Sequence, residues 1–494
     1  MNAYHQLVEH TKNIAHFEHL SAICGWDQAA MMPAGGAEAR AQAMAALQVH
    51  IHQLMNQPQL TEWFAQAEQE PLSAEQQAVL REMKRQWQQA TVLPESLVQA
   101  QSIAGARCEH AWRQQRQDND WAGFSANWEE VVKLSREEAQ IRAAATGKTP
   151  YDAMLDLYEP GASTQTLDSL FDDVKSWLPA LIDRVLEKQS HESILLPRGN
   201  YPSETQKSLG LAVMKQLQFD FDHGRLDEST HPFCGGVPTD VRITTRYSET
   251  EFVQSLMGIV HETGHARYEQ GLPKAYAGTP AGEARSMGIH ESQSLFFEMQ
   301  IGRNPLFINH LADLASQHFN AHNDPVFAKA NLQKLYSRVS KDFIRVDADE
   351  LTYPAHVILR YEIERDLING VIEFRDVPEL WDHKMQNYLG LSTQGNYRQG
   401  CMQDIHWTDG SFGYFPSYTL GAMYAAQFMA AMKKTVDVDG VIHSGDLTPI
   451  FTWLSDNIWC KGSLLTTDEL VKQATGETLN AEHFKAHLEG RYLG

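Results

Sequence analysis

The chain has 494 residues, 43% of them hydrophobic, and carries a formal net charge of −22 at pH 7 with a pI near 5.4. Because one hydrophobic core usually stops growing at roughly 250–300 residues, we expect a single unit spanning residues 1–494 with two helical lobes. A surface this acidic repels nucleic acid and anionic membranes, which excludes both as partners.

The spacing of the cysteines and the N-terminal sequence indicate the cellular compartment of the protein. The five cysteines are widely separated and contain no Cys-x-x-Cys pair, so they predict neither a disulfide framework nor a thiolate metal site. No stretch approaches the ~18 consecutive apolar residues that a membrane helix needs. The first twenty residues also lack the basic-then-apolar pattern of an export signal. We therefore expect a cytoplasmic protein.

Helical periodicity dominates the first part of the chain. Apolar residues recur at three- and four-residue steps from Tyr4 to Phe17, and stretches rich in Ala, Gln and Glu at 37–70 and 74–147 continue this pattern. The segments 191–205 and 224–238 are rich in Gly, Pro, Ser and Asp, which predicts connections between the lobes. The fold class is therefore mainly α.

Two short segments depart from the helical pattern. From Val241 to Tyr247, apolar or β-branched residues alternate with polar ones, and the segment 402–407 is short and leads into the turn sequence at 408–411. Both are predicted as strands of one small sheet.

An apolar helix is predicted next. Ser248 and Glu251 have the spacing of a capping box, which predicts the helix start, and Gly271-Leu272-Pro273 predicts its end. Within this helix His261 and His265 are four residues apart, so both imidazoles project from one face and can bind one metal ion.

Glu262, which lies between the two histidines, adds a carboxylate to this pattern. Neutral imidazoles hold Zn²⁺, and the ion lowers the pKa of its bound water to about 7. Glu262 stands beside the ligands, where its carboxylate can take the proton of that water. The sequence His-Glu-x-x-His therefore indicates a zinc-dependent hydrolase, with Glu262 as its general base.

A catalytic zinc site needs a third protein ligand. Glu269 is eight residues beyond His261, which is ~12 Å along a helix and too far for a shared metal ion. The third ligand should therefore come from another helix. Glu283, Glu291 and Glu298 are the candidates, in a stretch bounded by the helix start and stop signals Thr279-Pro280 and Asn304-Pro305. Spacing alone does not choose among the three.

Several further motifs occur in a fixed order along the chain. They are His261-Glu262-Thr263-Gly264-His265 followed by His290-Glu291-Ser292-Gln293, together with His231-Pro232-Phe233, Asp240-Val241-Arg242-Ile243-Thr244, Ile344-Arg345-Val346-Asp347-Ala348-Asp349 and Gly400-Cys401-Met402-Gln403-Asp404-Ile405-His406-Trp407. In these motifs the sequence resembles the carboxypeptidase Taq family of zinc metallocarboxypeptidases, and the resemblance extends over most of the chain.

The resemblance implies a fold, a ligand set and an activity. Glu291 would be the third zinc ligand beside His261 and His265, with Co²⁺ as a possible substitute for Zn²⁺. The fold would be a helical saddle with a deep active-site groove and a small sheet near the zinc site, and the protein would be a homodimer. Its substrates would be peptides with a free C-terminus, which lose single C-terminal residues with broad specificity and with proline disfavoured.

A carboxypeptidase must also recognise the C-terminal carboxylate of its substrate. A guanidinium group binds a carboxylate bidentately, and Arg242 and Arg345 are the candidates because both lie in family motifs. The alternative for Arg345 is a structural ion pair with Asp347 or Asp349. Two other arginines, Arg246 and Arg360, are expected on solvated helix or strand faces.

The oxyanion of the tetrahedral intermediate needs a hydrogen-bond donor. His406, Tyr414 and Tyr418 are the candidates, with a role as buried core residues as the alternative. His290 and Gln293 flank Glu291 and are expected to orient it. We interpret the apolar stripe that follows as core rather than substrate pocket: Leu295, Phe296 and Met299.

Other functions remain open at this stage. An endo-oligopeptidase or a dipeptidyl carboxypeptidase would use the same metal ligands, and product length discriminates between these enzymes. An aminopeptidase is less well supported, because the chain lacks a Gly-x-Met-Glu-Asn sequence. A helical binding protein would hold a purely structural metal and catalyse no hydrolysis.

Overall fold

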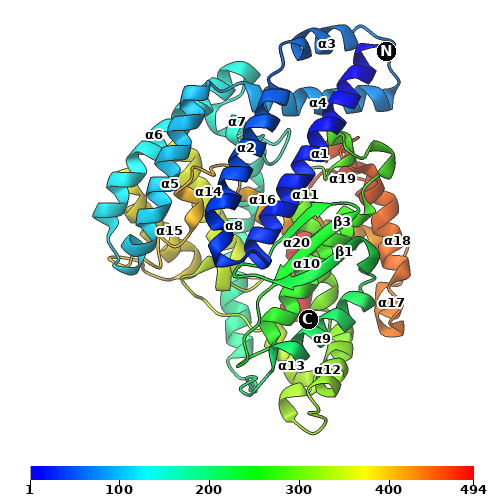
Figure 1. The fold of residues 1–494 in the computed structure, drawn as a ribbon. Helices are drawn as coiled ribbons and strands as arrows, with labels where there is room; N and C mark the ends of the chain where they lie inside the picture. The colour runs from blue at the N-terminus through cyan, green and yellow to red at the C-terminus, as the bar shows by residue number, and fades with distance from the viewer. Residues whose placement is uncertain (1) are drawn as a thin grey trace.

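The computed structural model describes residues 2–494, which form a mainly helical molecule with one small sheet (Figure 1). The helices before the sheet are α1 (Ala3–Ala30), α2 (Ala37–Met55), α3 (Gln59–Ala67), α4 (Ala74–Thr91), α5 (Glu95–Gln117), α6 (Trp121–Thr146), α7 (Pro150–Leu155), α8 (Thr164–Gln189) and α9 (Ser203–Gln216). The predicted helical stretches at 37–70 and 74–147 are confirmed.

The second part of the chain is also helical. Its helices are α10 (Val253–Gly271), α11 (Met287–Leu295), α12 (Pro305–His318), α13 (Lys329–Tyr336), α14 (Tyr353–Ile368), α15 (Val377–Leu389), α16 (Pro416–Met432), α17 (Val438–Ser444), α18 (Thr448–Asn457), α19 (Thr467–Thr475) and α20 (Glu482–Leu493). Within residues 2–494, no helix combines the length and the apolar character needed to cross a membrane.

The sheet has three strands, β1 (Gly224–Glu228), β2 (Cys234–Val237) and β3 (Asp240–Thr245), in the order β1-β3-β2. β3 pairs parallel with β1 and antiparallel with β2, and it packs against α10. The strand predicted from the alternation at 241–247 is therefore confirmed. The sheet lies over the helix that carries His261 and His265 (Figure 1).

Two predictions about strands and connections are wrong. The segment 224–238 contains β1 and β2, because its glycines belong to a hairpin: Gly236 has a φ of 103°, and a Cβ there would lie 2.0 Å from the carbonyl oxygen of Asp240. The segment 402–407 forms a turn followed by a short 3₁₀ helix, Ile405–Trp407, rather than a strand. Its backbone amides bond locally, with Met402 donating to Tyr397 and Gln403 to Gly400. By contrast, most of the connection predicted at 191–205 is confirmed: residues 191–202 join α8 and α9 without helix or strand, and the last three residues begin α9.

The start of α10 also differs from its prediction, while its end at Gly271 agrees. The helix begins at Val253, and Ser248 and Glu251 form an isolated β-bridge before it. Glu251 still serves the helix terminus, because its Oε2 accepts a hydrogen bond from the backbone amide of Gln254 at 3.1 Å. The carboxylate therefore replaces the predicted serine hydroxyl as the capping group.

The helix predicted from Thr279-Pro280 begins later than expected. Pro280 starts only a short 3₁₀ turn, and α11 begins at Met287, where Ser286 caps the backbone amide of Ile289 at 3.1 Å. After Leu295 the helix widens into a π-helical stretch, Phe296–Gly302. Asn304 then caps α12, which agrees with the predicted stop.

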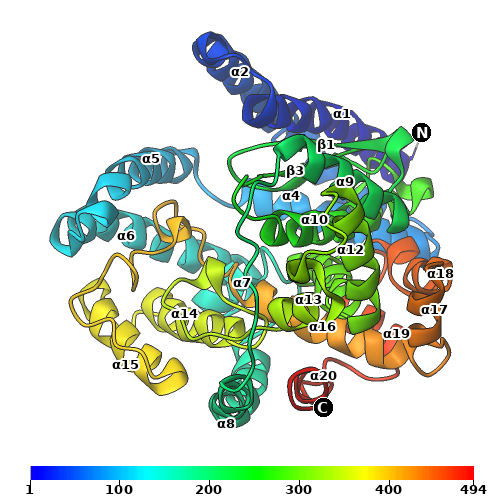
Figure 2. The ribbon, with the colours of Figure 1, turned by 90° about the horizontal axis from the view of Figure 1, so that it is seen from below.

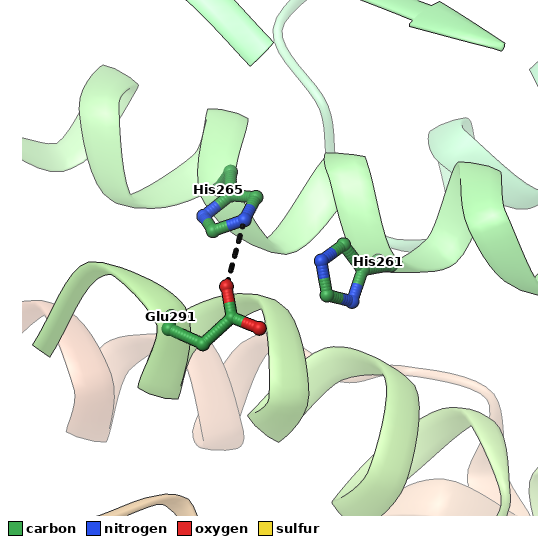
Figure 3. Close-up of side chains that lie close together, drawn as sticks. All are labelled: His261, His265 and Glu291. Carbon is green, nitrogen blue, oxygen red and sulfur yellow. Dashed lines mark ion pairs between the residues drawn. The ribbon is translucent and has the colours of Figure 1, made fainter. Parts of the chain in front are cut away.

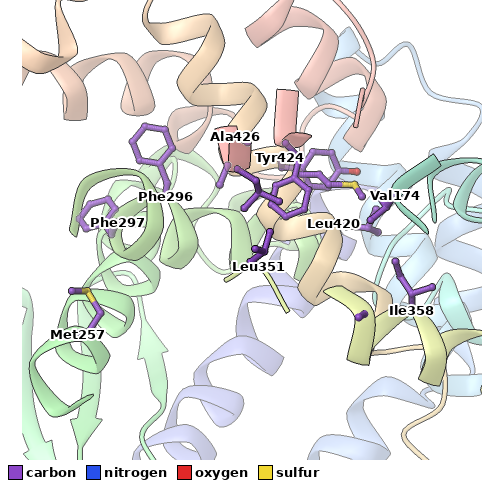
Figure 4. Packing of buried hydrophobic residues seen from close by; sticks show 14 of the residues in the cluster. Val174, Met257, Phe296, Phe297, Leu351, Ile358, Leu420, Tyr424 and Ala426 are labelled. Atoms are coloured by element: carbon purple, nitrogen blue, oxygen red, sulfur yellow. The ribbon is translucent and has the colours of Figure 1, made fainter. Parts of the chain in front are cut away.

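The main hydrophobic core surrounds α11, its π-helical continuation and α16. Phe296 and Phe297 from the continuation and Leu420 and Tyr424 from α16 belong to one buried cluster (Figure 4). Burying a large apolar side chain contributes about 1.5–3 kcal/mol. The core therefore fixes the position of α11 relative to its neighbours.

A buried ion pair anchors the chain where it enters α11. Arg285 is 3% exposed and donates to both carboxylate oxygens of Glu82 on α4, at 2.9 and 3.1 Å. Arg85 also donates to Glu82, at 2.9 Å. Burial alone would raise the pKa of Glu82, but the hydrogen bonds and charges of the two arginines lower it to about 2.

This pair should make the fold sensitive to acid. A carboxyl group whose pKa falls on folding stabilises the fold fully above its unfolded pKa, here near 4.5, and loses this contribution as the pH falls toward about 2. Between about pH 6 and about pH 3, the free energy of unfolding of the wild type should fall by roughly 2 kcal/mol more than that of Glu82→Gln, which has no carboxyl to protonate. Urea unfolding at both pH values measures the difference.

A matched control is Glu62→Gln, a substitution at an exposed position of α3. In this variant the free energy of unfolding should depend on pH as it does in the wild type. If the free energy of unfolding fell equally with pH in the wild type and in Glu82→Gln, protonation of Glu82 would not contribute to the loss of stability in acid.

Candidate metal centre

The two histidines of α10 lie one turn apart on the same face of the helix. The ring centroids of His261 and His265 are 5.1 Å apart. Burial lowers the pKa of His265 to about 4, which favours the neutral imidazole that binds metal ions. The prediction that both imidazoles project from one face of the helix is therefore confirmed.

Glu291 projects from α11 toward the two histidines (Figure 3). Its Oε2 is 3.4 Å from Nε2 of His265, and one ligand atom from each of the three residues lies within 4.8 Å of the others. Among the residues that the structure describes, this is the only His, Cys, Asp and Glu group with such a geometry. Two imidazoles and a carboxylate fit a divalent metal ion such as zinc.

The other glutamates considered as a third ligand lie elsewhere. Glu283 accepts a hydrogen bond from Gln86 at 2.8 Å, and Glu269 contacts His290 at 2.7 Å. Glu298 contacts Nδ1 of His261, the nitrogen on the side opposite Nε2, at 2.9 Å. None of the three belongs to the cluster of His261, His265 and Glu291.

The spacing of α10 and α11 depends on a glycine inside the His-Glu-x-x-His sequence. A Cβ at Gly264 would lie 2.5 Å from the carbonyl oxygen of Gln293 and 2.7 Å from Cα of Ser294. A second glycine acts on the other side of α11, where a Cβ at Gly421 of α16 would lie 2.7 Å from Cγ of Glu291. Glu291 is therefore held between two helices that approach closely because glycine has no side chain.

A second layer of polar side chains orients the two histidines. His261 Nδ1 contacts Glu298, which also accepts a hydrogen bond from Arg303 at 2.8 Å. His265 Nδ1 contacts His290 at 2.6 Å, and His290 contacts Glu269. With Nδ1 engaged on each ring, Nε2 remains for the metal ion.

Some of these partners could have been found from the sequence. Glu269 is four residues after His265, and Glu298 is seven residues after Glu291, so each lies on the same helix face as a ligand. Of the two residues expected to orient Glu291, His290 contacts His265 instead. Gln293 accepts a hydrogen bond from the indole of Trp459 at 2.8 Å.

Glu262 is buried beside the three candidate ligands. Its side chain is 8% exposed, and its Oε2 has no hydrogen-bond partner within residues 2–494. Burial raises the pKa of Glu262 to about 7, with a further contribution from the charge of Glu291. A carboxyl group with this pKa can both accept and release a proton near neutral pH.

A groove opens beside the candidate ligands. It encloses a cavity of about 540 Å³, whose lining includes His261, Glu291, Tyr353 and Tyr418. Leu295 and Met299 also line it, so the interpretation as core is wrong for Met299 and is confirmed only in part for Leu295, which packs against the main core as well. Phe296 is fully buried as expected. The widened turn after Leu295 lets the same segment contribute to both the core and the cavity wall.

Arg345 lies in a buried position next to the groove. Its guanidinium donates to Asp404 at 2.9 Å and to the hydroxyl of Tyr353 at 2.6 Å. The alternative of an ion pair with Asp347 or Asp349 is wrong, because Asp404 is the partner. Tyr353 lines the cavity, so Arg345 is one hydrogen bond away from it.

The other arginines have different surroundings. Arg242 pairs with Asp240 at 2.8 Å and stacks on Trp26 with its Cζ 4.2 Å from the ring centroid, and it does not line the cavity. Arg246 is exposed, as expected. The expectation that Arg360 is solvated is wrong: it is 1% exposed, because it bonds Glu364 and Asp404 in the core.

The three candidate oxyanion donors form a row of rings. The centroids of His406 and Tyr414 are 6.0 Å apart, and those of Tyr414 and Tyr418 are 5.2 Å apart. Tyr418 lines the cavity with Glu291, whereas Tyr414 and His406 do not line it. Their roles in catalysis stay predictions.

A helix-borne pair of histidines, a glutamate from a second helix and a buried carboxylate beside a groove are the arrangement of a metallopeptidase. A sequence model described as carboxypeptidase Taq (M32) metallopeptidase matches residues 6–492. The chain belongs to this family and is a metallocarboxypeptidase, a peptide hydrolase.

Proteins of known sequence and structure support this assignment. The chain is 37% identical to thermostable carboxypeptidase 1 of Thermus thermophilus over 99% of its own length and 98% of that protein. It is 35% identical to carboxypeptidase 1 of Bacillus subtilis over 97% and 96% of the two chains. The solved structure of Trypanosoma cruzi metallocarboxypeptidase 1 matches with a TM-score of 0.98 and 47% identity, covering 100% of this chain and 99% of the other.

The glycine between α10 and α11 should be necessary for the metal site. Gly264→Ala places a methyl group against the backbone of α11, so the helices must separate and the ligand atoms move apart. We expect metal affinity to fall about tenfold or more and stability to fall by about 1–3 kcal/mol. Competition with a chelator and thermal unfolding measure the two effects.

The same helix provides a matched control. A Cβ at Gly258 meets nothing within 4 Å, so Gly258→Ala should retain the metal and gain roughly 0.5–1 kcal/mol from its better helix propensity. If Gly264→Ala retained the metal as firmly as Gly258→Ala, the close approach of α10 and α11 would not determine the site.

Proposed function

We propose that this chain is a zinc-dependent carboxypeptidase that releases single amino acids from the C-terminus of peptides. In this proposal His261, His265 and Glu291 hold Zn²⁺ and Glu262 is the general base. The observation that carries it is the convergence of the three ligand atoms within 4.8 Å, beside a groove that encloses a cavity of about 540 Å³. Membership of the metallocarboxypeptidase family supports the same reading.

The donor set supports zinc as the metal. His265 is neutral at pH 7, since burial lowers its pKa, and Glu291 is ionised, because the hydrogen bond from His265 and the charge of His261 outweigh its burial. The pKa of His261 is raised despite its burial, because Glu298 accepts its hydrogen bond and Glu291 is negatively charged, so a metal ion must displace a proton from this ring. Two imidazoles and a carboxylate then bind Zn²⁺ and also Co²⁺, so we propose that Co²⁺ can replace Zn²⁺.

The catalytic step follows from the position of Glu262. The metal, when bound, supplies Lewis-acid chemistry toward water and toward the scissile carbonyl group. Glu262 takes the proton of the attacking water and delivers it to the nitrogen of the departing amino acid. Its pKa of about 7 suits both transfers near neutral pH. Burial of the carboxylate also keeps bulk water from competing for the proton.

Residues around the groove complete the proposed site. We propose that Arg345 or Arg242 binds the C-terminal carboxylate and that Tyr418, Tyr414 or His406 donates a hydrogen bond to the oxyanion. The contact of Arg345 with Tyr353 and the place of Tyr418 in the cavity lining favour these two residues. Donors placed where charge develops in the transition state commonly contribute about 3–4 kcal/mol each.

The remaining properties rest on the family resemblance. We propose one catalytic unit whose two helical lobes flank the groove. In Figure 2, α5, α6, α14 and α15 lie toward one side of the molecule and α9, α12, α17 and α18 toward the other, which supports two lobes. We further propose a cytoplasmic homodimer with broad specificity that disfavours proline at the C-terminal residue.

The direction of cleavage tests this function. A peptide with a blocked N-terminus and a free C-terminus should lose one C-terminal residue at a time when incubated with the zinc-loaded protein, as followed by mass spectrometry. The ladder should be absent with a chelator and absent when the C-terminus is amidated. Dipeptide products or internal cuts would indicate a dipeptidyl carboxypeptidase or an endo-oligopeptidase, and no cleavage with Zn²⁺ or Co²⁺ would indicate a structural metal.

The role of Glu262 has its own test. Glu262→Gln removes the proton acceptor and keeps the three ligands, so kcat should fall by about 10²–10⁴-fold while the bound metal, measured by elemental analysis, is unchanged. Asp347→Asn is a control that changes another carboxylate of the groove and should retain activity. A metal-loaded Glu262→Gln variant with wild-type kcat would exclude Glu262 as the base.

A further inference from the structure

A second cavity, of about 650 Å³, lies between the ends of several helices. Its walls come from the C-terminal end of α8, from α12, α13 and α20, and from the end of α16. In Figure 2, α20 lies beside α8, and α13 and α16 lie near them. A cavity of this size is large enough for a small metabolite.

The lining of this cavity is basic, although the whole chain has a net charge of −22. Its only carboxylate side chain within residues 2–494 is Glu192. The basic side chains are Lys188, Arg303, Lys334, Lys433 and Arg491. His487 also lines the cavity, but burial lowers its pKa, so its imidazole adds no charge near neutral pH.

Some of these cations already have partners. Arg303 bonds Glu298 and Arg491 bonds Glu350, each at 2.8 Å. Lys188 donates to the backbone carbonyl oxygen of Tyr492 at 3.1 Å and to a main-chain oxygen of Gly494, the last residue of the sequence, at 3.2 Å. These groups contribute positive electrostatic potential to the cavity, but they already donate hydrogen bonds to other groups of the protein.

Lys334 and Lys433 are different. Each is exposed, and neither ammonium group has an ion-pair or hydrogen-bond partner within residues 2–494. Lys334 comes from α13 and Lys433 directly follows α16, so the two charges reach the cavity from different elements. Like charges that line one cavity repel each other, and an anion between them relieves this repulsion.

Neutral groups of the cavity also suit an anion. Asn304 and Pro305 at the N-terminus of α12 line it, and the positive end of this helix dipole favours negative charge at that wall, whereas the C-terminal ends of α8, α13, α16 and α20 bring partial negative charge to the other walls. The amide of Gln300, which contacts His487 at 3.2 Å, adds a hydrogen-bond donor to the same wall.

We propose that this cavity binds a small phosphate-bearing anion, and that Lys334 and Lys433 are the residues that hold it. A phosphate dianion supplies two charges and several acceptor oxygens, which match two ammonium groups from separate elements. Inorganic phosphate and a phosphate ester share this chemistry. The cavity is separate from the metal groove, although Arg303 lines both.

Calorimetric titration of the zinc-loaded enzyme with inorganic phosphate, and separately with glucose 6-phosphate, tests the proposal. The wild type should bind with a Kd of about 1 mM or below, and binding should weaken as the concentration of sodium chloride rises. The probe with the lower Kd identifies whether the free ion or an ester is the better ligand.

Two variants locate the binding. Lys334→Ala/Lys433→Ala should weaken the affinity about tenfold or more and leave peptidase activity unchanged, because both side chains are exposed and lie outside the catalytic groove. Lys434→Ala removes a neighbouring exposed lysine that does not line the cavity, and it should bind as the wild type does. No binding of either probe to the wild type would overturn the proposal. So would unchanged binding to the double variant, which would place phosphate on the metal ion or elsewhere.

Discussion

The metal centre depends on how closely α10 and α11 approach each other. Gly264 removes the side chain that would keep the helices apart, and Gly421 gives Glu291 room against α16. Metal ligands must be placed to within about 0.2 Å of their preferred distances, so a shift of one helix by the width of a methyl group is enough to disrupt the site. The three elements that carry the site also contribute to the same core, which resists such a shift (Figure 4).

Buried ion pairs hold the walls of the groove in place. Arg285 with Glu82 fixes the entry into α11, and Asp404 joins Arg345 to Arg360 beneath the row of aromatic rings. Such pairs contribute little net stability over apolar residues of the same volume, but breaking one costs about 3–5 kcal/mol because a buried charge is left alone. Their effect is therefore to allow one arrangement of the helices and to disfavour others.

The sequence predicts the helical fold, the strand at 241–247 and the positions of His261 and His265, because these depend on local periodicity and spacing. It could not choose Glu291 over Glu283 and Glu298, since that choice depends on how two helices pack; the family resemblance supplied it. The segment 402–407 was misread because Asp404 and Trp407 face a buried network that no local pattern reveals. Arg360 was misplaced for the same reason. Met299 was misplaced because it lies within the wider turn, where a regular helical period does not hold.

The widened turn at Phe296–Gly302 has an evolutionary consequence. A π-helical turn is equivalent to a regular helix into which one extra residue has been inserted, and each such residue rotates everything beyond it by about 100° around the axis. Glu298 and Arg303 contact each other across this turn, and Glu298 also reaches His261. Deleting one residue would restore an ordinary helix and improve its local hydrogen bonding, yet it would turn the guanidinium away from its carboxylate. Sequence changes in this stretch should therefore be limited to substitutions, with changes of length excluded.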